Sequence, residues 1–505
     1  MRAEAGMKTG SRYENGKKYG NGERDRNGRK RMKKPARLLL TVLAAALCYI
    51  VAGAVLPFVR QPEVSTETKE RFEKKEFYVE APGTERAAVL SDNVDALAER
   101  IRLISRAQER IILSTFEFRN DESGKDIMAA LLAAADRGVQ VQILVDGMPA
   151  FKNLQLPSDP YFQVLSSHAN IELAIYNPVN PLEPWKLMGR LHDKYLIADD
   201  TAYILGGRNT YDFFLGDYGN YKNYDWDVLV YSEEPGQGES MNALLDYFTQ
   251  VWELPLCRLW KDDPALQSGK RVTQAREALE ERYLSLQERF PDWFVPCDYM
   301  EMTREVSHIE LLSNPIHCYA KEPVVYYEMT ELMKRAEGEV RFHTPYIICN
   351  GWMLQRLAEV CGSVDDVMMM TNSAANNGNP FGAMDYRKYR SEILETGVGI
   401  LEYDDGVSYH GKCFVIDDRL SGIGSFNWDM RSAYLDTELM LVIDSVQLNE
   451  DLRAGMAEYE EKTLTVVDED TVLVPEGMTA QKSGFPDRLL NGILSFFAGW
   501  ARFLM

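Results

Sequence analysis

Histidine and cysteine are scarce in this 505-residue chain, and their spacing gives no sign of a metal site. The six histidines and seven cysteines include no Cys-x-x-Cys pair and no Cys/His spacing typical of zinc ligands. We therefore expect that the protein needs no metal and no cofactor. The six cysteines after Cys48 could form disulfides in an oxidising compartment or pack as small apolar side chains, and the sequence leaves both open.

Basic residues are in short supply beyond the N-terminus. The chain has 56 Lys and Arg against 77 Asp and Glu, a formal net charge of −21. Residues 1–60 carry 14 basic and 4 acidic residues, which leaves −31 for the rest. A strongly acidic body argues against binding to the phosphate backbone of nucleic acids, so we expect no nucleic-acid partner.

Only one long apolar run is present, at residues 38–58, where 21 residues pass without a charge. As a helix this run would extend about 31 Å, close to the bilayer core of about 30 Å. Residues 1–37 contain 13 Lys and Arg and residues 59–81 contain five, which predicts a cytoplasmic N-terminus with the body outside the membrane. We interpret the run as an uncleaved anchor; a signal peptide cleaved at Ala52-Gly53-Ala54 is the alternative.

A polar motif occurs twice, in "GRLHDKYLIAD" and, 218 positions later, in "SYHGKCFVID". Each copy reads His-x-Lys-x4-Asp and is followed by a Gly-rich segment, "GGRN" or "GSFN", that ends in Asn. The two sets are His192, Lys194, Asp199 and Asn209, and His410, Lys412, Asp417 and Asn427. Two full copies in the same frame are improbable by chance, so we expect catalysis rather than two unrelated surface clusters.

Two such sets suit one phosphodiester site. Lysine ammoniums and asparagine amides supply donors for the charge that builds on the phosphate oxygens. One imidazole must be neutral to attack phosphorus, and the other must be protonated to release the alcohol. Each half of the chain would then contribute one histidine to a shared site, and the near-symmetry leaves their roles open. We expect the other four histidines to be structural or surface residues: His168, His308, His317 and His343.

Hydrophobic patterning predicts an α/β fold in both halves. In the first, a strand at 109–120, a helix at 124–138 and a strand at 139–147 predict parallel pairing. The second repeats the order with a strand at 340–348, a helix at 351–361, a strand at 364–373, a helix at 386–397 and a strand at 398–403. In each half the motif and the segment after it predict a hairpin that returns the Asn beside the His and Lys.

These segments resemble the phospholipase D superfamily, and most closely bacterial cardiolipin synthases. The resemblance rests on "HDKYLIADDTAYILGGRN", "HGKCFVIDDRLSGIGSFNWDMRS", "AADRGVQVQILVDG" and "TNSAANN", and covers about residues 90–255 and 305–455. It implies two pseudo-symmetric α/β/α sandwich halves that share one active site, a phosphohistidine mechanism, and a bacterial cell-membrane enzyme. It also implies phospholipid partners, with phosphatidylglycerol expected and phosphatidylethanolamine as a further candidate.

The resemblance also implies residue roles. His192 would be the nucleophile and His410 the general acid and base. An acidic residue after each motif would orient a histidine: Glu438 for one, and Asp227, with Asp225 as a substitute, for the other. We expect Asp199 and Asp417, although part of the catalytic motif, to hold strand and loop by hydrogen bonding. The expected phosphate-binding residues are Lys194, Asn209, Lys412, Ser425 and Asn427, and Arg208 is an even choice between substrate contact and a surface role.

The predicted organisation has eight parts. They are a basic disordered cytoplasmic tail (1–36), a transmembrane anchor (37–59), a linker (60–85), a phospholipase D-like half (86–260), a helical connector (261–305), a second such half (306–465), a linker (466–487) and an amphipathic helix (488–505). The last helix would lie in the membrane plane or dock on the protein's own surface, and we favour the membrane.

These features predict a membrane-anchored phosphatidyltransferase that makes cardiolipin. Phospholipase D hydrolysis to phosphatidic acid would use the same residues and is the main alternative. A superfamily nuclease fits the acidic body and the anchor less well, and a non-catalytic membrane scaffold would leave the paired motifs without a use.

Overall fold

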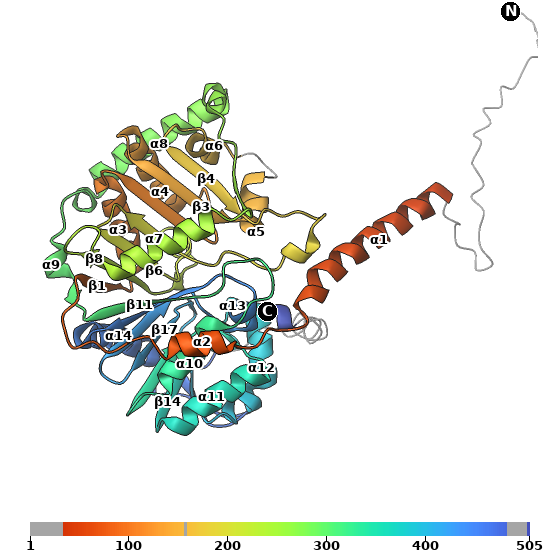
Figure 1. Cartoon of the computed structure of the whole chain (residues 1–505), viewed down its shortest axis with the longest axis vertical. Coiled ribbons are helices and arrows are strands. Elements are labelled where there is room, and N and C mark those ends of the chain that lie inside the picture. Colours follow the sequence, from red (N-terminus) through yellow and green to blue (C-terminus); the bar gives the residue numbers. More distant parts are fainter. Residues whose placement is uncertain (1–33, 156–158, 482–501) are drawn as a thin grey trace, which may run out of the picture. The chain divides into compact units, whose positions relative to one another are not determined.

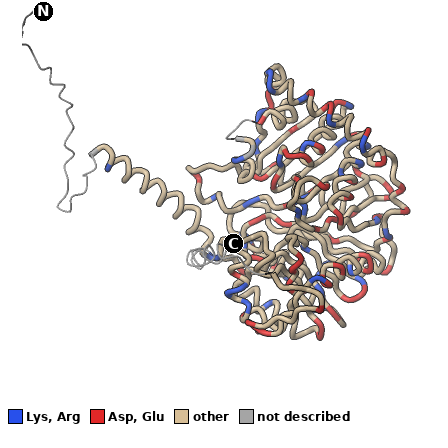
Figure 2. The backbone as a smooth tube through the Cα atoms, turned by 180° about the vertical axis from the view of Figure 1, so that it is seen from behind, with Lys and Arg blue, Asp and Glu red and all other residues tan. Residues whose placement is uncertain are grey.

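The computed structural model describes residues 34–155, 159–481 and 502–505, and its contacts divide the chain into Met1–Ala52 and Gly53–Met505. Helix α1 (Lys34–Val55) covers most of the predicted anchor. Within the described residues one segment, Pro35–Phe58, is long and apolar enough to cross a membrane, with a mean hydropathy of 2.5. Figure 2 shows α1 free of charged residues along nearly all its length. Residues 1–33 of the predicted tail and residues 488–501 of the predicted C-terminal helix lie outside the described residues, while residues 34–36, also expected in the disordered tail, belong to α1.

Two nine-stranded sheets form the body, and eight strands in each follow the same order, which confirms the predicted pair of α/β halves (Figure 1); among the described residues, β10 and β22 are additional edge strands without a counterpart in the other sheet. The first runs β10-β1-β8-β6-β5-β2-β3-β4-β9 and the second β11-β20-β18-β17-β12-β14-β15-β21-β22. The first sheet comprises β1 (Glu85–Leu90), β2 (Arg110–Thr115), β3 (Gln140–Asp146), β4 (Ile171–Tyr176), β5 (Tyr195–Ala198), β6 (Ala202–Gly206), β8 (Asp227–Ser232), β9 (Cys257–Leu259) and β10 (Arg304–Glu305). The second comprises β11 (His308–Ser313), β12 (Glu339–His343), β14 (Asp366–Asn372), β15 (Gly399–Tyr403), β17 (Cys413–Ile416), β18 (Leu420–Gly424), β20 (Leu439–Asp444), β21 (Thr463–Val466) and β22 (Val472–Leu473).

Helices cover the outer face of each sheet, while the inner faces meet. The first outer layer consists of α3 (Asn93–Arg106), α4 (Glu122–Asp136), α6 (Pro160–Ser166) and α8 (Lys270–Arg289). The second consists of α10 (Val324–Met333), α11 (Gly351–Ser363), α12 (Pro380–Leu394) and α13 (Met430–Tyr434). Between the sheets, side chains of both halves form one core with α7 (Glu239–Trp252) and α14 (Val446–Glu460). We call this shared core the seam.

The crossover units are those that the patterning predicts. Strand β2 pairs in parallel with β3 across α4, and β12 pairs in parallel with β14, which pairs in parallel with β15. Helix α12 begins six residues before its predicted start because the Asn379 side chain caps the backbone N–H of Phe381 and Pro380 fits the first turn. The predicted strand at 340–348 is broken after His343, and Ile347–Ile348 forms the separate strand β13.

Helix α8, expected in a connector, belongs to the first half. Its buried face, with Val272, Ala275 and Leu279, lies in the first outer core. Arg276 pairs with Asp136 at one end of α4, and Arg282 pairs at 2.5 Å with Asp126 near the other end. The charged pattern that predicts an exposed connector therefore describes only the outer side of a packed helix.

The segment expected as a linker at 60–85 is also packed, and we call residues 58–84 the strap. It contains helix α2 (Thr66–Phe72) and buries Phe58, Phe72 and Phe77 in the core of the second half. Its backbone is tied to distant residues: Ser65 N–H donates to Glu322 at 2.6 Å and Val79 N–H donates to Asp444 at 2.7 Å. A flexible tether would bury no such phenylalanines.

The motif aspartates end the first strands of the two hairpins. Asp199 follows β5 and accepts hydrogen bonds from the backbone N–H groups of residues 108–110, at 2.8–3.0 Å for the shortest contact to each. Asp417 follows β17 and accepts from residues 337–339 at 2.8–3.0 Å. Both have φ near +50°, a region that Asp tolerates better than most residues. These contacts match the expectation that they hold strand and loop.

Replacing Asp417 with Ala should lower the free energy of unfolding by about 2–3 kcal/mol, because three N–H groups lose their acceptor and Ala is strained at positive φ. Urea unfolding of the full chain measures the change. The exposed neighbour Asp418, changed to Ala, is the matched control and should shift stability by less than about 0.5 kcal/mol. Equal losses in the two variants would contradict the assignment.

Candidate active site

Each motif histidine is positioned by backbone contacts with the opposite half. His192 N–H donates to the Thr437 hydroxyl at 3.1 Å, next to an isolated bridge between Leu191 and Thr437. His410 N–H donates to the Tyr224 carbonyl at 2.6 Å. There the short strands β7 (Asn223–Tyr224) and β16 (Ser408–Tyr409) pair in parallel. The two loops therefore meet across the seam.

The carboxylates that contact the histidines also come from the opposite half. Glu438 Oε1 lies 2.9 Å from His192 Nδ1, and Asp225 Oδ2 lies 2.6 Å from His410 Nδ1. Both carboxylates are fully buried. A carboxylate at Nδ1 fixes the ring and leaves Nε2 for a substrate.

The prediction that Asp227 orients a histidine is wrong, and Asp225, the substitute, takes that place. Asp227 is instead buried between Arg100, at 2.9 Å, and Arg208, at 3.3 Å. Sheet register explains the error, because Gly206 faces Asp227 whereas its counterpart Gly424 faces Met440. Glu438 therefore corresponds to the residue two positions before Asp227. The similar letters "WDVLV" and "TELMLV" hide this two-residue offset.

Arg208 accordingly has a structural position. Its guanidinium donates to the carbonyls of Leu90 and Ser91 and to the Asn93 side chain, and it is almost fully buried. It does not line the cavity that the two histidines share. The geometry supports neither of the two expectations for Arg208, substrate contact or a surface role. Arg208 is a buried structural residue that holds residues 90–93 of the first half by hydrogen bonds.

Ser425, expected to bind phosphate, lies behind Glu438. Its fully buried hydroxyl donates to Glu438 Oε2, while Ser432 donates to Oε1 at 2.6 Å. The counterpart Gly207 has no room for a side chain, since a Cβ there would come within 2.2 Å of Asp225 Oδ1. The Gly/Ser difference between the motifs thus follows from which carboxylate each one faces.

The two motif lysines lie beside the histidines, and Asn209 lines the cavity that the histidines share. Lys412 Nζ lies 2.7 Å from His410 Nδ1 and 3.6 Å from Asp225. Lys194 Nζ donates to the His192 carbonyl, and both lysines are almost fully buried. Asn209 Oδ1 accepts from the Glu117 N–H at 3.3 Å, and Asn427 is buried with its Oδ1 unsatisfied by protein groups.

Both histidines line one cavity of about 350 Å³. Aromatic rings flank them: Phe116 lies 5.3 Å from the His192 ring and Phe214 lies 5.0 Å from the His410 ring, centre to centre. Asn209 lines this cavity as predicted, but the sequence reading missed most of the other wall residues, which include Tyr211, Phe213, Tyr221, Tyr346, Asn377 and Asn379. Several of these follow directly after predicted strands or lie in "TNSAANN", so strand ends were the available signal.

Burial and charge set the proton affinities of the site. Burial and the neighbouring Lys194 hold the pKa of His192 well below its usual value, and burial with Lys412 lowers the pKa of His410 to about 4. Burial raises the pKa of Glu438 to about 8. Burial acts the same way on Asp225, but Lys412 and His410 outweigh it, so the pKa of Asp225 falls below its usual value. The two histidine–carboxylate pairs are thus chemically unequal.

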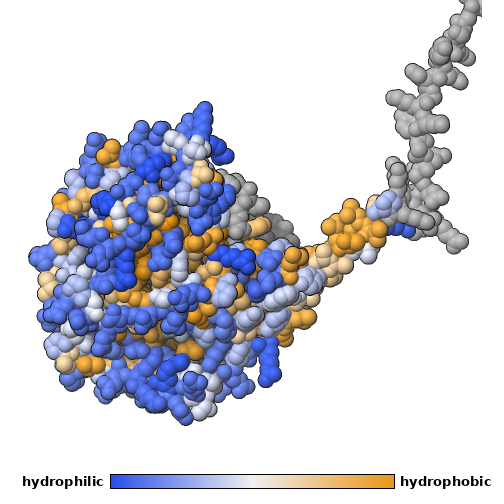
Figure 3. Space-filling view, turned by 45° about the horizontal axis from the view of Figure 1, so that its top comes forward, coloured by the Kyte–Doolittle hydropathy of each residue, from blue (hydrophilic) through white to orange (hydrophobic). Residues whose placement is uncertain are grey.

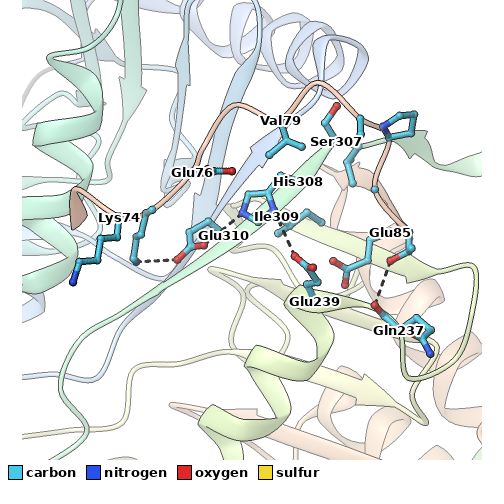
Figure 4. A pocket seen from close by; sticks show the side chains of 16 residues that line it. Lys74, Glu76, Val79, Glu85, Gln237, Glu239, Ser307, His308, Ile309 and Glu310 are labelled. Carbon is cyan, nitrogen blue, oxygen red and sulfur yellow. Dashed lines mark hydrogen bonds and ion pairs between the residues drawn. The ribbon is translucent and has the colours of Figure 1, made fainter. Parts of the chain in front are cut away.

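A larger cavity, of about 740 Å³, lies under the strap and contains none of the motif residues (Figure 4). Several of its charged groups are paired with one another: Lys75 with Glu310 at 2.9 Å, and His308 with Glu310 at 3.5 Å. The other non-motif histidines have protein partners too; His343, for example, contacts the Tyr409 hydroxyl and Glu460. In the part of the chain that the structure describes, no group of three or more His, Cys, Asp or Glu residues is arranged to hold a metal ion.

Changing Asp225 or Asp227 to Asn should have different effects. Asp225→Asn removes the charge that supports protonation of His410, so the pKa of His410 should fall further below about 4. Asp227→Asn should leave that pKa unchanged but cost about 3–5 kcal/mol of stability, because two buried arginines lose their partner. Histidine-selective NMR titration and urea unfolding measure the two effects. A shift of the His410 pKa in Asp227→Asn alone would contradict the assignment.

Comparison with known proteins gives relatives over most of the chain. Cardiolipin synthase C of Escherichia coli is 26% identical over 74% of this chain and 84% of its own length. An uncharacterized protein of Helicobacter pylori is 25% identical over 84% of this chain and 89% of its own. The crystal structure of phosphatidylserine synthase from Haemophilus influenzae superimposes with a TM-score of 0.61 at 15% identity, covering 87% of this chain and 99% of that one.

The family model described as "Cardiolipin synthase, PLD-like domain" matches residues 101–252 and 329–459, more than half of the chain. The two matched segments carry the two motifs, one in each sheet. The chain therefore belongs to the phospholipase D superfamily, close to the bacterial cardiolipin synthases, and is an enzyme of the phospholipase D type.

Proposed function

We propose that this enzyme is a membrane-anchored phosphatidyltransferase that makes cardiolipin through a phosphohistidine intermediate. The observation that carries the proposal is the pair of histidines that line one cavity, each with Nδ1 on a carboxylate from the other half. Such a pair supplies two Nε2 atoms to one substrate. The names of the relatives point to phospholipids as substrates, and a cavity wall that combines aromatic rings with polar side chains suits a phosphate head group.

In the first step His192 Nε2 attacks phosphorus and the bond to the head alcohol breaks. His410 donates its proton to the leaving oxygen, while Lys194 and Lys412 offset the negative charge on the phosphate oxygens. In the second step the acceptor hydroxyl gives its proton to His410, its oxygen attacks phosphorus and the bond to His192 breaks. The acceptor would be a hydroxyl of phosphatidylglycerol.

The unequal carboxylates support this division of roles. The ionised Asp225 stabilises a positive charge on His410, as a general acid requires. Glu438, whose pKa is raised to about 8, supports a charge on His192 less strongly, so His192 stays the better neutral nucleophile. The negative phosphodiester, once bound, would raise the pKa of His410 from its low value in the empty site.

Phosphatidylethanolamine stays a further candidate donor, but the cavity wall offers its ammonium group no free partner at Glu117. Arg119 already pairs with Glu117 at 2.7 Å and lies 3.7 Å from the centre of the Tyr211 ring. Helix α1 would hold the enzyme in the bacterial cell membrane, with a cytoplasmic N-terminus and the catalytic body outside.

A denaturing quench after mixing with ³²P-labelled phospholipid should trap label on His192. The label should be absent from His192→Ala and should persist longer in His410→Gln, because breakdown of the intermediate needs the base. Peptide mapping locates the label. Label on His410 would reverse the roles, and no labelled histidine in an active enzyme would refute the mechanism. Cardiolipin among the products supports transfer, whereas phosphatidic acid alone would indicate hydrolysis.

The value of kcat/KM should fall as the pH rises through about 8. Burial lowers the pKa of Lys194 to about 8, so its positive charge is present below that pH and is lost above it. Rate measurements between pH 5.5 and 9.5 test this, and Lys194→Arg, which keeps the charge, should move the alkaline limb upward. If the alkaline limb of the pH profile stays in place in Lys194→Arg, the loss of activity would be assigned to deprotonation of Glu438 instead.

A further inference from the structure

The carboxyl ends of the parallel strands in both sheets surround the active-site cavity. Phe116 and Glu117 follow β2, Tyr346 follows β12, and Asn377 follows β14, and all of these line the cavity. Other loops leave the same edges: residues 147–155 after β3, 177–191 after β4, and the start of α12 beyond β14. These loops therefore border the mouth of the cavity.

The loops at this edge carry large apolar side chains that are exposed to solvent, and we call these the rim. Leu182 is 77% exposed, so most of its apolar side chain is in contact with water. The members are Met148, Phe151, Leu182 and Trp185 in the first half, Tyr221 on the cavity wall, and Phe381 in the second half. Figure 3 shows apolar surface in the middle and on the right side of the body, with smaller apolar patches among the hydrophilic residues elsewhere in that view.

Chain connectivity brings the rim close to the end of the apolar segment. That segment ends at Phe58, which is itself buried in the core of the second half. Gly53, which belongs to the same compact unit as the body, is so close to Pro184 that a Cβ on it would meet the proline ring at 2.4 Å. Pro184 lies between Leu182 and Trp185, so this part of the rim is held beside the point where the chain leaves α1.

We propose that the rim inserts into the outer part of the lipid bilayer and places the cavity mouth against it. The inference rests on the proposed function only in taking a bilayer lipid as substrate. A bilayer surface fits the observations because the exposed groups are apolar, come from loops of both halves, and include aromatic rings suited to the membrane interface. The substrate would then reach the histidines without leaving the membrane completely.

Fluorescence quenching tests the insertion without any need for activity. The full chain with Leu182→Trp is placed in phosphatidylglycerol/phosphatidylethanolamine vesicles whose acyl chains carry bromine. The additional tryptophan emission should be quenched at least twofold. Val467→Trp is the matched control: Val467 is 54% exposed and follows β21, whose antiparallel pairing with β15 puts it at the opposite edge of the sheet. Equal quenching at both positions, or none at position 182, would overturn the proposal.

A rate comparison separates this proposal from the proposed function. The double variant Leu182→Asp, Phe381→Asp should lower kcat/KM at least fivefold on long-chain lipid in vesicles, yet stay within twofold of the wild type on monomeric short-chain lipid. Val467→Asp should change neither rate. An equal loss of kcat/KM on both substrates would overturn the proposal that the rim inserts into the bilayer. A wild-type protein that turns over neither substrate would refute the proposed function. The quenching result would still show whether the rim inserts into the bilayer.

Discussion

Every other feature of the site depends on the exchange of carboxylates across the seam. His192 is held by Glu438 and His410 by Asp225, so each half completes the other's histidine and neither contains a whole site. An imidazole that must point at one phosphorus atom tolerates little displacement. The seam meets this requirement with large buried side chains from both halves, where Trp226 donates to the Tyr409 hydroxyl and Tyr176 donates to the carbonyl of Ile316.

Local patterns in the sequence were enough to predict those features of the fold and the site that depend on residues close together in the chain. The repeated His, Lys and Asn, the hairpins and the strand–helix–strand units all depend on spacing within about 40 residues, and Glu438 lies close behind its motif. The prediction assigned the carboxylate that contacts His410 to Asp227, two positions after Asp225. The chain between motif and carboxylate is longer in the first half, and only sheet register reveals the correct equivalence. Ser425 was misassigned because spacing does not tell which neighbour a hydroxyl faces.

Long-range packing could not be predicted, because local patterns do not tell which distant residues a segment contacts. The strap and α8 both carry many charges, and charge patterns describe the solvent side of a segment better than its buried side. Three phenylalanines spaced over 20 residues have neither helical nor strand periodicity, so nothing local marks Phe58, Phe72 and Phe77 as core residues. Their partners lie in the second half of the chain.

The strap has a consequence for biosynthesis. Ribosomes make it early, but its binding partners come much later: Ser65 waits for Glu322, 257 residues on, and Val79 waits for Asp444, 365 residues on. At typical elongation rates of about 5–20 residues per second, its apolar side chains stay uncovered for tens of seconds. The nascent chain would thus need shielding, by a chaperone or by the first sheet, until the second sheet has emerged.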